Sequence, residues 1–328
     1  MGKPAAEPLV SPQALVSAVA RLIGPDAAHA DRFGIAVSGG PDSMALLSLA
    51  ASAFPARVSA ATVDHRLRAE SAAEAQMVAE HCQAATIDHH ILTPDQPITG
   101  TLQASARAAR YALLESWRTA QGIDWLMTAH HADDQLETLV MRINRGSGVG
   151  GLAGVRARQG RVLRPLLGFR RQALSDWCVQ DDLPTIADPS NENERYDRAR
   201  IRASLAGQAL VDPLAVSESA GLLDQADRAL DWAVDRLMDD HYVAADGGVT
   251  LHLPALPEEL ARRLLLRALA ALEPGRAAPR RRASDHALAE VHAGRQAMLG
   301  DVLLSPMKDG ELAIRLTRAP PRRSGQPE

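Results

Sequence analysis

The stretch GIAVSGGPDSMALL (residues 34–47) is an apolar strand, a glycine turn and the start of a helix in direct succession. A helix N-terminus offers unpaired N–H groups and a partial positive charge, so a glycine turn at this place suits phosphate binding. The common nucleotide loop, G-x-x-x-x-G-K, adds a lysine that reaches the terminal phosphates. This turn has no lysine and instead carries Asp42, with Ser38 and Ser43 on either side. It therefore indicates a phosphate site of another kind.

The turn itself predicts which groups would bind phosphate. Proline lacks an N–H group and has a fixed φ, which suits the first helical position and makes Gly40 the N-cap. The expected donors are the serine hydroxyls and the amides around Gly39, Gly40, Asp42 and Ser43, but not that of Pro41. Because a carboxylate repels phosphate unless a divalent cation bridges them, Asp42 predicts Mg²⁺. The alternative is an ordinary strand–helix turn in which Asp42 is a surface capping residue.

Strands and helices alternate through the first half of the chain. Strand-like segments are expected at 33–37, 57–65, 86–92 and 123–130, and helical segments at 44–53, 69–85, 102–122 and 132–144. This alternation predicts an α/β fold with a parallel, doubly wound sheet. Ligands of such sheets bind at the carboxyl ends of the strands. The polar clusters SGGPDS, VDHRLR and AHHADD all fall at those ends, which predicts one common site.

Length and composition predict two domains. With 328 residues, the chain is long for a single core. We expect an α/β domain at 1–212, then a smaller, mainly helical domain at 213–328 with a disordered tail from about residue 318. Cys82 and Cys178 lie far apart, which argues against a disulfide framework or a metal–sulfur site. No run is long and apolar enough to cross a membrane, and we expect a soluble, cytoplasmic protein.

The string S-G-G-x-D-S after a strand resembles the pyrophosphate loop of the ATP pyrophosphatase (PP-loop) superfamily. Six further motifs narrow the resemblance, and they occur in this order: VDHRLR (63–68), QASARAARY (103–111), AHHADDQLET (129–138), NRGSGVGGL (144–152), RPLL (164–167) and DPSNENERYDRARIR (188–202). Together they resemble the tRNA(Ile)-lysidine synthetase family over residues 33 to 205. One departure is Arg66, where that family usually has glycine.

The resemblance implies an ATP- and Mg²⁺-dependent ligase. Such an enzyme adenylates the wobble cytidine of tRNA(Ile) with a CAU anticodon and then joins free lysine to its carbon 2, releasing AMP and pyrophosphate. The implied partners are this tRNA and lysine, with no membrane; a homodimer is allowed for. Two alternatives stay open: another adenylating PP-loop enzyme of the tRNA thiolase type, and a non-catalytic RNA-binding relic. Neither cysteine lies in a pair suited to handling sulfur.

The motif AHHADDQLE could be a metal site or simply the acidic start of a solvated helix. The resemblance favours a catalytic interpretation, in which Asp134 and a histidine line the reaction centre. Asp134 suits the ammonium group of a substrate, and either His130 or His131 could move the proton that amine attack releases. The resemblance also implies that Arg107 contacts ATP or the transition state.

Arginine supplies almost all the positive charge, because lysine occurs only at Lys3 and Lys308. Residues 140–175 contain eight arginines and no acidic residue, although the formal net charge of the chain is −4. Three more arginines follow at helical spacing, so one helix face would present them all. We expect the following to contact tRNA phosphates: Arg145, Arg195, Arg198 and Arg202. A solvated basic face is the alternative.

Overall fold

The computed structural model describes residues 8–65, 71–94, 102–186, 197–205, 207, 210–245, 247–253, 256–307 and 313–319. Its contacts divide the chain into two units, Met1–Asp224 and Gln225–Glu328. The division falls inside helix α10 (Pro213–His241), which starts directly after the boundary predicted at residue 212. The predicted domain limits stay a prediction, and most of the predicted tail lies outside the described residues.

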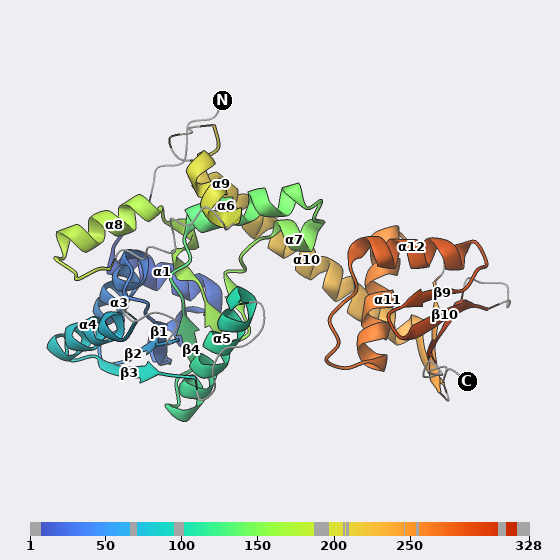
Figure 1. Cartoon of the computed structure of the whole chain (residues 1–328), viewed down its shortest axis with the longest axis horizontal. Coiled ribbons are helices and arrows are strands. Elements are labelled where there is room, and N and C mark those ends of the chain that lie inside the picture. The colour runs from blue at the N-terminus through green and yellow to red at the C-terminus, as the bar shows by residue number, and fades with distance from the viewer. Residues whose placement is uncertain are drawn as a thin grey trace, which may run out of the picture. The chain divides into compact units, whose positions relative to one another are not determined.

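Six strands form the sheet of the first unit, in the order β3-β2-β1-β4-β6-β5. Figure 1 labels β1 to β4. Their bounds are β1 (Phe33–Ala36), β2 (Val58–Val63), β3 (Asp88–Leu92), β4 (Trp125–Met127), β5 (Arg158–Gln159) and β6 (Val162–Leu163). Neighbouring strands run parallel, except that β5 pairs antiparallel with β6. The predicted α/β fold with a parallel sheet is confirmed.

Helices cover both faces of this sheet. The helices of the first unit before α10 are α1 (Pro12–Ile23), α2 (Pro25–Ala30), α3 (Pro41–Ala53), α4 (Ser71–Ala84), α5 (Leu102–Ala120), α6 (Ala132–Asn144), α7 (Val149–Leu152), α8 (Arg171–Gln180) and α9 (Asp197–Leu205), with a 3₁₀ turn η1 (Pro165–Gly168). Residues of α1, α3, α4 and α8 share the larger core, whereas α5 packs against the opposite face. No helix in the described part of the chain is long and apolar enough to cross a membrane.

Alternate residues of each strand enter the two cores, as the period of a β-strand requires. On β1, Ile35 belongs to the larger core and Ala36 to the α5 core. On β4, Met127 and Leu126 divide in the same way. A Cβ at Gly34 would lie 2.6 Å from the ring of Trp117, so this glycine is what lets α5 approach β1 closely. The α5 core is the smaller one because a single helix supplies its cover.

The second unit combines helices with an antiparallel sheet. Its strands follow the order β7-β8-β11-β10-β9. The bounds are β7 (Tyr242–Ala245), β8 (Gly248–His252), β9 (Ala297–Leu299), β10 (Val302–Pro306) and β11 (Ala313–Arg318), with helices α11 (Glu258–Leu272) and α12 (Arg281–His292). Apolar residues of both helices and the sheet form its core. The sequence predicts a mainly helical domain, and the structure adds this five-stranded sheet.

Both cysteines are buried free thiols, and this gives a first prediction. Burial raises the pKa of the Cys82 thiol to about 11, and mainly burial raises that of Cys178 to about 11. Since the thiolate is the reacting form, only about one thiol in a thousand is reactive at pH 8. Native protein should therefore react with a disulfide reagent at least about a hundredfold more slowly than the protein in denaturant, and faster as the pH rises. Two fast-reacting thiols in the native protein would contradict this.

Candidate functional site

The glycine turn between β1 and α3 has the predicted geometry. Pro41 is the first residue of α3, and Gly40 is its N-cap. Gly39 has a φ of 82°, which is left-handed backbone that L side chains rarely adopt. A Cβ there would also lie 3.3 Å from Ile186, whose N–H donates to the carbonyl of Gly39 at 2.9 Å. Both conformation and space therefore require glycine at this position.

Hydrogen bonds within the turn leave a group of backbone donors available. The hydroxyl of Ser43 donates to the Gly40 carbonyl at 2.9 Å and accepts from the Ser38 N–H at 3.1 Å. The Ser43 N–H donates to the same carbonyl, so its predicted role as a phosphate donor is already replaced by an internal bond. Within the described part of the chain, the N–H groups of Gly39, Gly40 and Asp42 have no acceptor. Such a cluster at a helix N-terminus is a site for an anion.

Asp42 faces the same space. Its Oδ1 is buried and accepts no hydrogen bond from any residue that the structure describes. A buried carboxylate oxygen without a donor is rare in proteins, and a water molecule, a ligand or an ion then supplies the missing partner. The side chain is 29% exposed, so this oxygen lies at the edge of the site rather than in the core. The donor set therefore fits a hard cation such as Mg²⁺, held by one carboxylate and by phosphate oxygens.

His131 connects the glycine turn to α6. It is the N-cap of that helix: its Nδ1 accepts from the Asp134 N–H at 3.3 Å, and Asp134 Oδ2 accepts from the His131 N–H at 3.1 Å. With Nδ1 accepting, the neutral ring carries its proton on Nε2. That atom lies 3.5 Å from Asp42 Oδ2 and 3.6 Å from Asp134 Oδ2. The ring, which is 2% exposed, thus joins two of the predicted catalytic carboxylates.

Negative charge dominates around His131. Burial by itself would lower the pKa of the ring, but a hydrogen bond with Asp42 and the charges of Asp134, Asp42 and Asp133 raise it above its ordinary value. Asp42, His131 and Asp134 therefore lie together at the carboxyl ends of β1 and β4. No group of three or more His, Cys, Asp or Glu side chains arranged for a metal ion occurs among the described residues.

Asp133, the neighbour of Asp134, has a different role. It accepts hydrogen bonds from Arg170 at 3.1 Å and from the Arg171 N–H at 2.7 Å. Burial would raise the pKa of this carboxyl, but these two donors lower it below its ordinary value. Asp133 thus attaches the start of α6 to the start of α8. Its charge is neutralised by Arg170, whereas Asp42 pairs with no arginine in the described part of the chain and lies 3.5 Å from the ring of His131.

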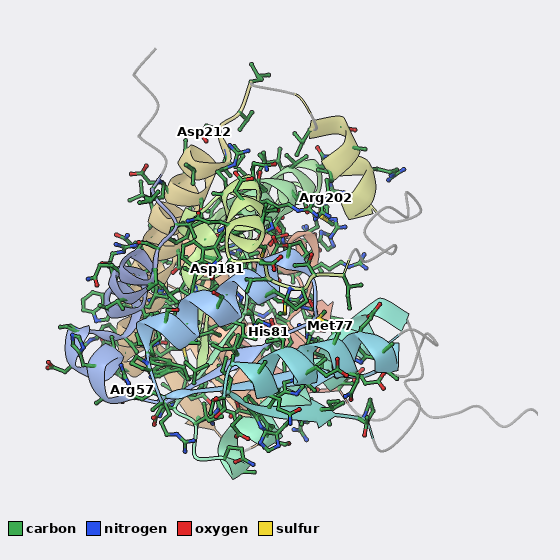
Figure 2. All side chains as sticks on the ribbon, turned by 90° about the vertical axis from the view of Figure 1, so that its left-hand side faces the viewer. Arg57, Met77, His81, Asp181, Arg202 and Asp212 are labelled. Atoms are coloured by element: carbon green, nitrogen blue, oxygen red, sulfur yellow. The ribbon has the colours of Figure 1, made fainter. Side chains whose placement is uncertain are left out.

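Arg202, labelled in Figure 2, lies on α9 and pairs with a residue of α6. Its Nε and Nη2 donate to the two oxygens of Glu137 at 2.6 Å and 3.2 Å. Glu137 lies one turn after Asp134 and is buried. Burial opposes the charge of Arg202, but Glu137, Asp134 and Asp42 together raise its pKa. The sequence predicts Arg202 as a phosphate contact. It does not reveal the ion pair with Glu137, because 65 residues separate the two partners.

The other residues that the sequence predicts for the site either have different contacts or lie outside the described residues. His130 Nδ1 lies 3.0 Å from Thr128 Oγ1, and Arg107 lies over the ring of Tyr111 at 5.3 Å. Arg145 is exposed at the C-cap of α6. Arg66, Arg195 and the side chain of Arg198 lie outside the described residues. The roles assigned to all these residues stay predictions.

Most arginines of the basic run are used within the fold. Arg156 pairs with Asp224, and Arg170 pairs with Asp133. Arg158 and Arg161 both lie over Trp125, at 4.7 Å and 4.9 Å from the centre of its ring. The lack of acids within the run thus hid partners that come from elsewhere in the chain. A basic run without nearby acids is a weak signal for RNA.

Three comparisons place the chain among known proteins. The family pattern described as a PP-loop domain matches residues 13–209. A tRNA(Ile)-lysidine synthase of Novosphingobium aromaticivorans is 44% identical over 88% of this chain and 90% of its own. That of Zymomonas mobilis is 40% identical over 89% and 90%.

A solved structure, the U34-tRNA thiolase NcsA of Methanococcus maripaludis, matches the fold with a TM-score of 0.54. Its identity is 15%, and the match covers 65% of this chain and 79% of that one. At this identity the likeness concerns the fold alone. The family match and the two synthases concern most of the sequence, including the glycine turn and the start of α6. The chain therefore belongs to the tRNA(Ile)-lysidine synthase family of PP-loop proteins.

Proposed function

We propose that this protein is an ATP-dependent ligase that joins free lysine to carbon 2 of the wobble cytidine in tRNA(Ile) with a CAU anticodon. The observation that carries the proposal is the anion site of the glycine turn beside a carboxylate with a buried, unpartnered oxygen. Membership of the synthase family supports the choice of substrates.

The proposed reaction has two steps, and each is a substitution. The carbonyl oxygen of the cytosine attacks the α-phosphorus of ATP, and pyrophosphate leaves. The ε-amine of lysine then attacks carbon 2, AMP leaves with the oxygen, and the amine loses a proton. Both steps exchange one leaving group for one nucleophile, so no oxidant or sulfur donor is needed.

In the first step the glycine turn binds the departing pyrophosphate. The N–H groups of Gly39, Gly40 and Asp42 donate toward the anion, and the start of α3 adds its partial positive charge. Asp42 would hold Mg²⁺, which neutralises charge between the carboxylate and the phosphates. Because these donors are fixed before the reaction, they stabilise the leaving group without reorganisation.

In the second step Asp134 attracts the ammonium group of lysine and positions it beside the adenylated base. Asp134 is held by its capping bond with His131, so its carboxylate is oriented before lysine arrives. His131 and His130 are the candidates for taking the proton that the attacking amine releases. A homodimer stays a prediction.

A direct assay tests the function. Purified protein is incubated with ATP, Mg²⁺, unfractionated tRNA and one labelled amino acid at a time. We expect label to enter RNA with lysine alone, in tRNA(Ile) with a CAU anticodon, and pyrophosphate release to depend on tRNA. Label from another amino acid, or pyrophosphate release with no label in RNA, would overturn the proposal. A thiolase would need reactive sulfur, and both cysteines are buried with raised pKa values.

Replacing Asp134 should mainly harm the use of lysine. The side chain also caps α6, so Asp134→Ala removes both a charge and a cap, whereas Asp134→Asn keeps a capping oxygen. Charged hydrogen bonds contribute about 1.5–3 kcal/mol, so the KM for lysine should rise about ten- to a hundredfold in both variants. Adenylated tRNA should remain detectable in both. Only Asp134→Ala should also lower the thermal unfolding midpoint. An unchanged KM for lysine in Asp134→Asn would exclude this role.

A further inference from the structure

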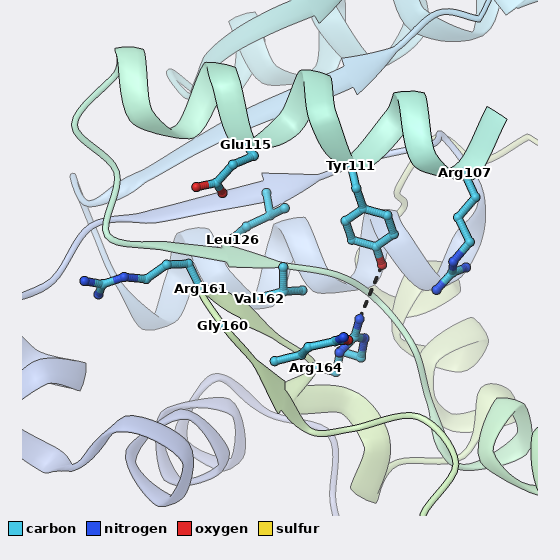
Figure 3. Close-up of a pocket in the computed structure, with 9 residues that line it drawn as sticks. Arg107, Tyr111, Glu115, Leu126, Gly160, Arg161, Val162 and Arg164 are labelled. Atoms are coloured by element: carbon cyan, nitrogen blue, oxygen red, sulfur yellow. Dashed lines mark hydrogen bonds between the residues drawn. The ribbon is translucent and has the colours of Figure 1, made fainter. Parts of the chain in front are cut away.

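A pocket lies between α5 and the strands β4 and β6, on the face of the sheet that α5 covers (Figure 3). It encloses about 590 Å³, a volume within the range of small-ligand sites. Its lining comes from α5, β4 and the β5–β6 hairpin: Arg107, Tyr111, Glu115, Leu126, Gln159, Gly160, Arg161, Val162 and Arg164. Of the predicted catalytic residues, Arg107 alone lines it. The pocket is therefore distinct from the glycine turn and the Asp42 cluster.

One end of the pocket carries positive charge that the fold does not neutralise. Arg164 is 4% exposed; its Nη1 donates to the Arg156 carbonyl at 2.7 Å, and its Nη2 lies 3.4 Å from the Tyr111 hydroxyl. Its Nε is buried and has no acceptor in the described part of the chain. Within that part, neither Arg107 nor Arg164 forms an ion pair. Buried guanidinium groups are normally paired, so this end lacks an anion.

The pKa of Tyr111 reflects the same positive charge. Burial would raise the pKa of this phenol, but a hydrogen bond from Arg164 and the charges of Arg164, Arg107 and Arg110 lower it below its ordinary value. Burial and the charge of Arg107 likewise lower the pKa of Arg110. Positive groups thus surround the hydroxyl, and the hydroxyl proton is available to an acceptor placed in the pocket.

The rest of the pocket is suited to a base and a sugar. Leu126 and Val162 lie on neighbouring parallel strands and form an apolar floor. Glu115 lines the far end, and Arg118 neutralises it through bonds of 2.8 Å and 2.7 Å. A phosphate at the arginine end and a flat apolar group over the floor together describe a nucleotide. A free phosphate would leave this floor unused.

We propose that this pocket binds one nucleotide of the tRNA, other than the cytidine that reacts, with its phosphate held by Arg107, Tyr111 and Arg164. The proposal rests on the proposed function for the identity of the RNA. RNA-binding proteins commonly hold unstacked nucleotides of single-stranded loops in this way, with the base on an apolar or aromatic wall. A second anchored nucleotide would fix the loop while the reacting base is adenylated.

Two pairs of variants test the proposal by tRNA binding without ATP or lysine. Arg107→Gln is matched with Arg158→Gln, since both are exposed arginines over an aromatic ring but only Arg107 lines the pocket. Val162→Phe fills the floor and is matched with Val179→Phe at a site that is 82% exposed. Thermal unfolding of each variant verifies that the fold is intact.

We expect Arg107→Gln and Val162→Phe each to weaken tRNA binding about tenfold, and both controls to change it less than twofold. Arg107→Gln should also flatten the log–log salt dependence by about 0.7–0.9, as the loss of one phosphate contact requires, whereas Val162→Phe should leave that slope unchanged. Equal losses in variants and controls would overturn the proposal in favour of diffuse attraction. Weaker binding of AMP or ATP with tRNA binding intact would overturn it in favour of a free nucleotide.

The labelled-lysine assay on the wild type separates this proposal from the function itself. If lysine enters tRNA but the four variants bind tRNA alike, the pocket proposal fails and the function stands. If no lysine enters tRNA but binding still depends on Arg107 and Val162, the function fails and the pocket stands. Arg164 is not replaced, because it also donates to the Arg156 carbonyl. Weaker tRNA binding by an Arg164 variant could therefore result from a loss of folding.

Discussion

Asp42→Asn should reduce tRNA-dependent pyrophosphate release about a thousandfold while the protein stays folded. The substitution removes a charge and keeps the shape. A metal ion that bridges carboxylate and phosphate contributes several kcal/mol to the transition state, and each 1.36 kcal/mol is a factor of ten in rate. Asp42 is partly exposed, and its Oδ1 has no donor among the described residues that asparagine would lose. Stability should therefore be retained or rise slightly, since one of the like charges around His131 disappears.

Asp133→Asn is the matched control. Both carboxylates lie near His131, at 3.5 Å and 3.7 Å, but Asp133 is neutralised by Arg170 and bonds the start of α8. Its replacement should lower the thermal unfolding midpoint and leave pyrophosphate release within about threefold of the wild type. The two variants thus separate a group that acts on ATP from one that supports the fold. Full activity of Asp42→Asn at ordinary Mg²⁺ concentrations would reject the metal-binding role.

Local signals made the geometry of the glycine turn predictable. The helix start at Pro41, the N-cap at Gly40 and the need for glycine at position 39 all follow from backbone chemistry within a few residues. The placement of Asp42 opposite Asp134 follows from a general property of parallel sheets, whose strand ends meet at one edge. The exception is the Ser43 N–H, because its bond to the Gly40 carbonyl depends on the local turn geometry.

Long-range pairs could not be predicted from one sequence. The pocket is lined by α5, β4 and the β5–β6 hairpin, and no sequence pattern states how segments this distant in the chain come together. Arg164 belongs both to the motif RPLL and to the basic run, but neither pattern predicts that its side chain is buried. In the second unit, β8 pairs with β11, a strand distant in the chain, and this pairing joins the local hairpin β7–β8 to the consecutive strands β9, β10 and β11. The acidic partners of the arginines in residues 140–175 could not be predicted for the same reason.

The arginines of α9 allow one helix to test two roles for positive charge. The sequence predicts phosphate contacts for Arg198 and Arg202 alike, whereas the structure pairs Arg202 with Glu137. The glutamate side chain is 5% exposed and the arginine side chain 28%. Breaking a buried ion pair by removing one partner costs about 3–5 kcal/mol, and partial exposure lowers that cost.

We therefore expect Arg202→Ala to lower the free energy of unfolding by about 2–3 kcal/mol and the unfolding midpoint by about 5–10 °C. The salt dependence of tRNA binding should stay unchanged, because no phosphate contact is lost. Adding Glu137→Gln should restore part of the stability, since it removes the buried negative charge. Arg198→Ala, the same substitution on the same helix, should instead flatten the log–log salt slope by about 0.7–0.9 and leave the midpoint unchanged. It should weaken matched and mismatched tRNAs alike, because phosphate contacts carry no sequence information. A flattened slope with an unchanged midpoint in Arg202→Ala would show that this residue binds RNA rather than holding α9 against α6.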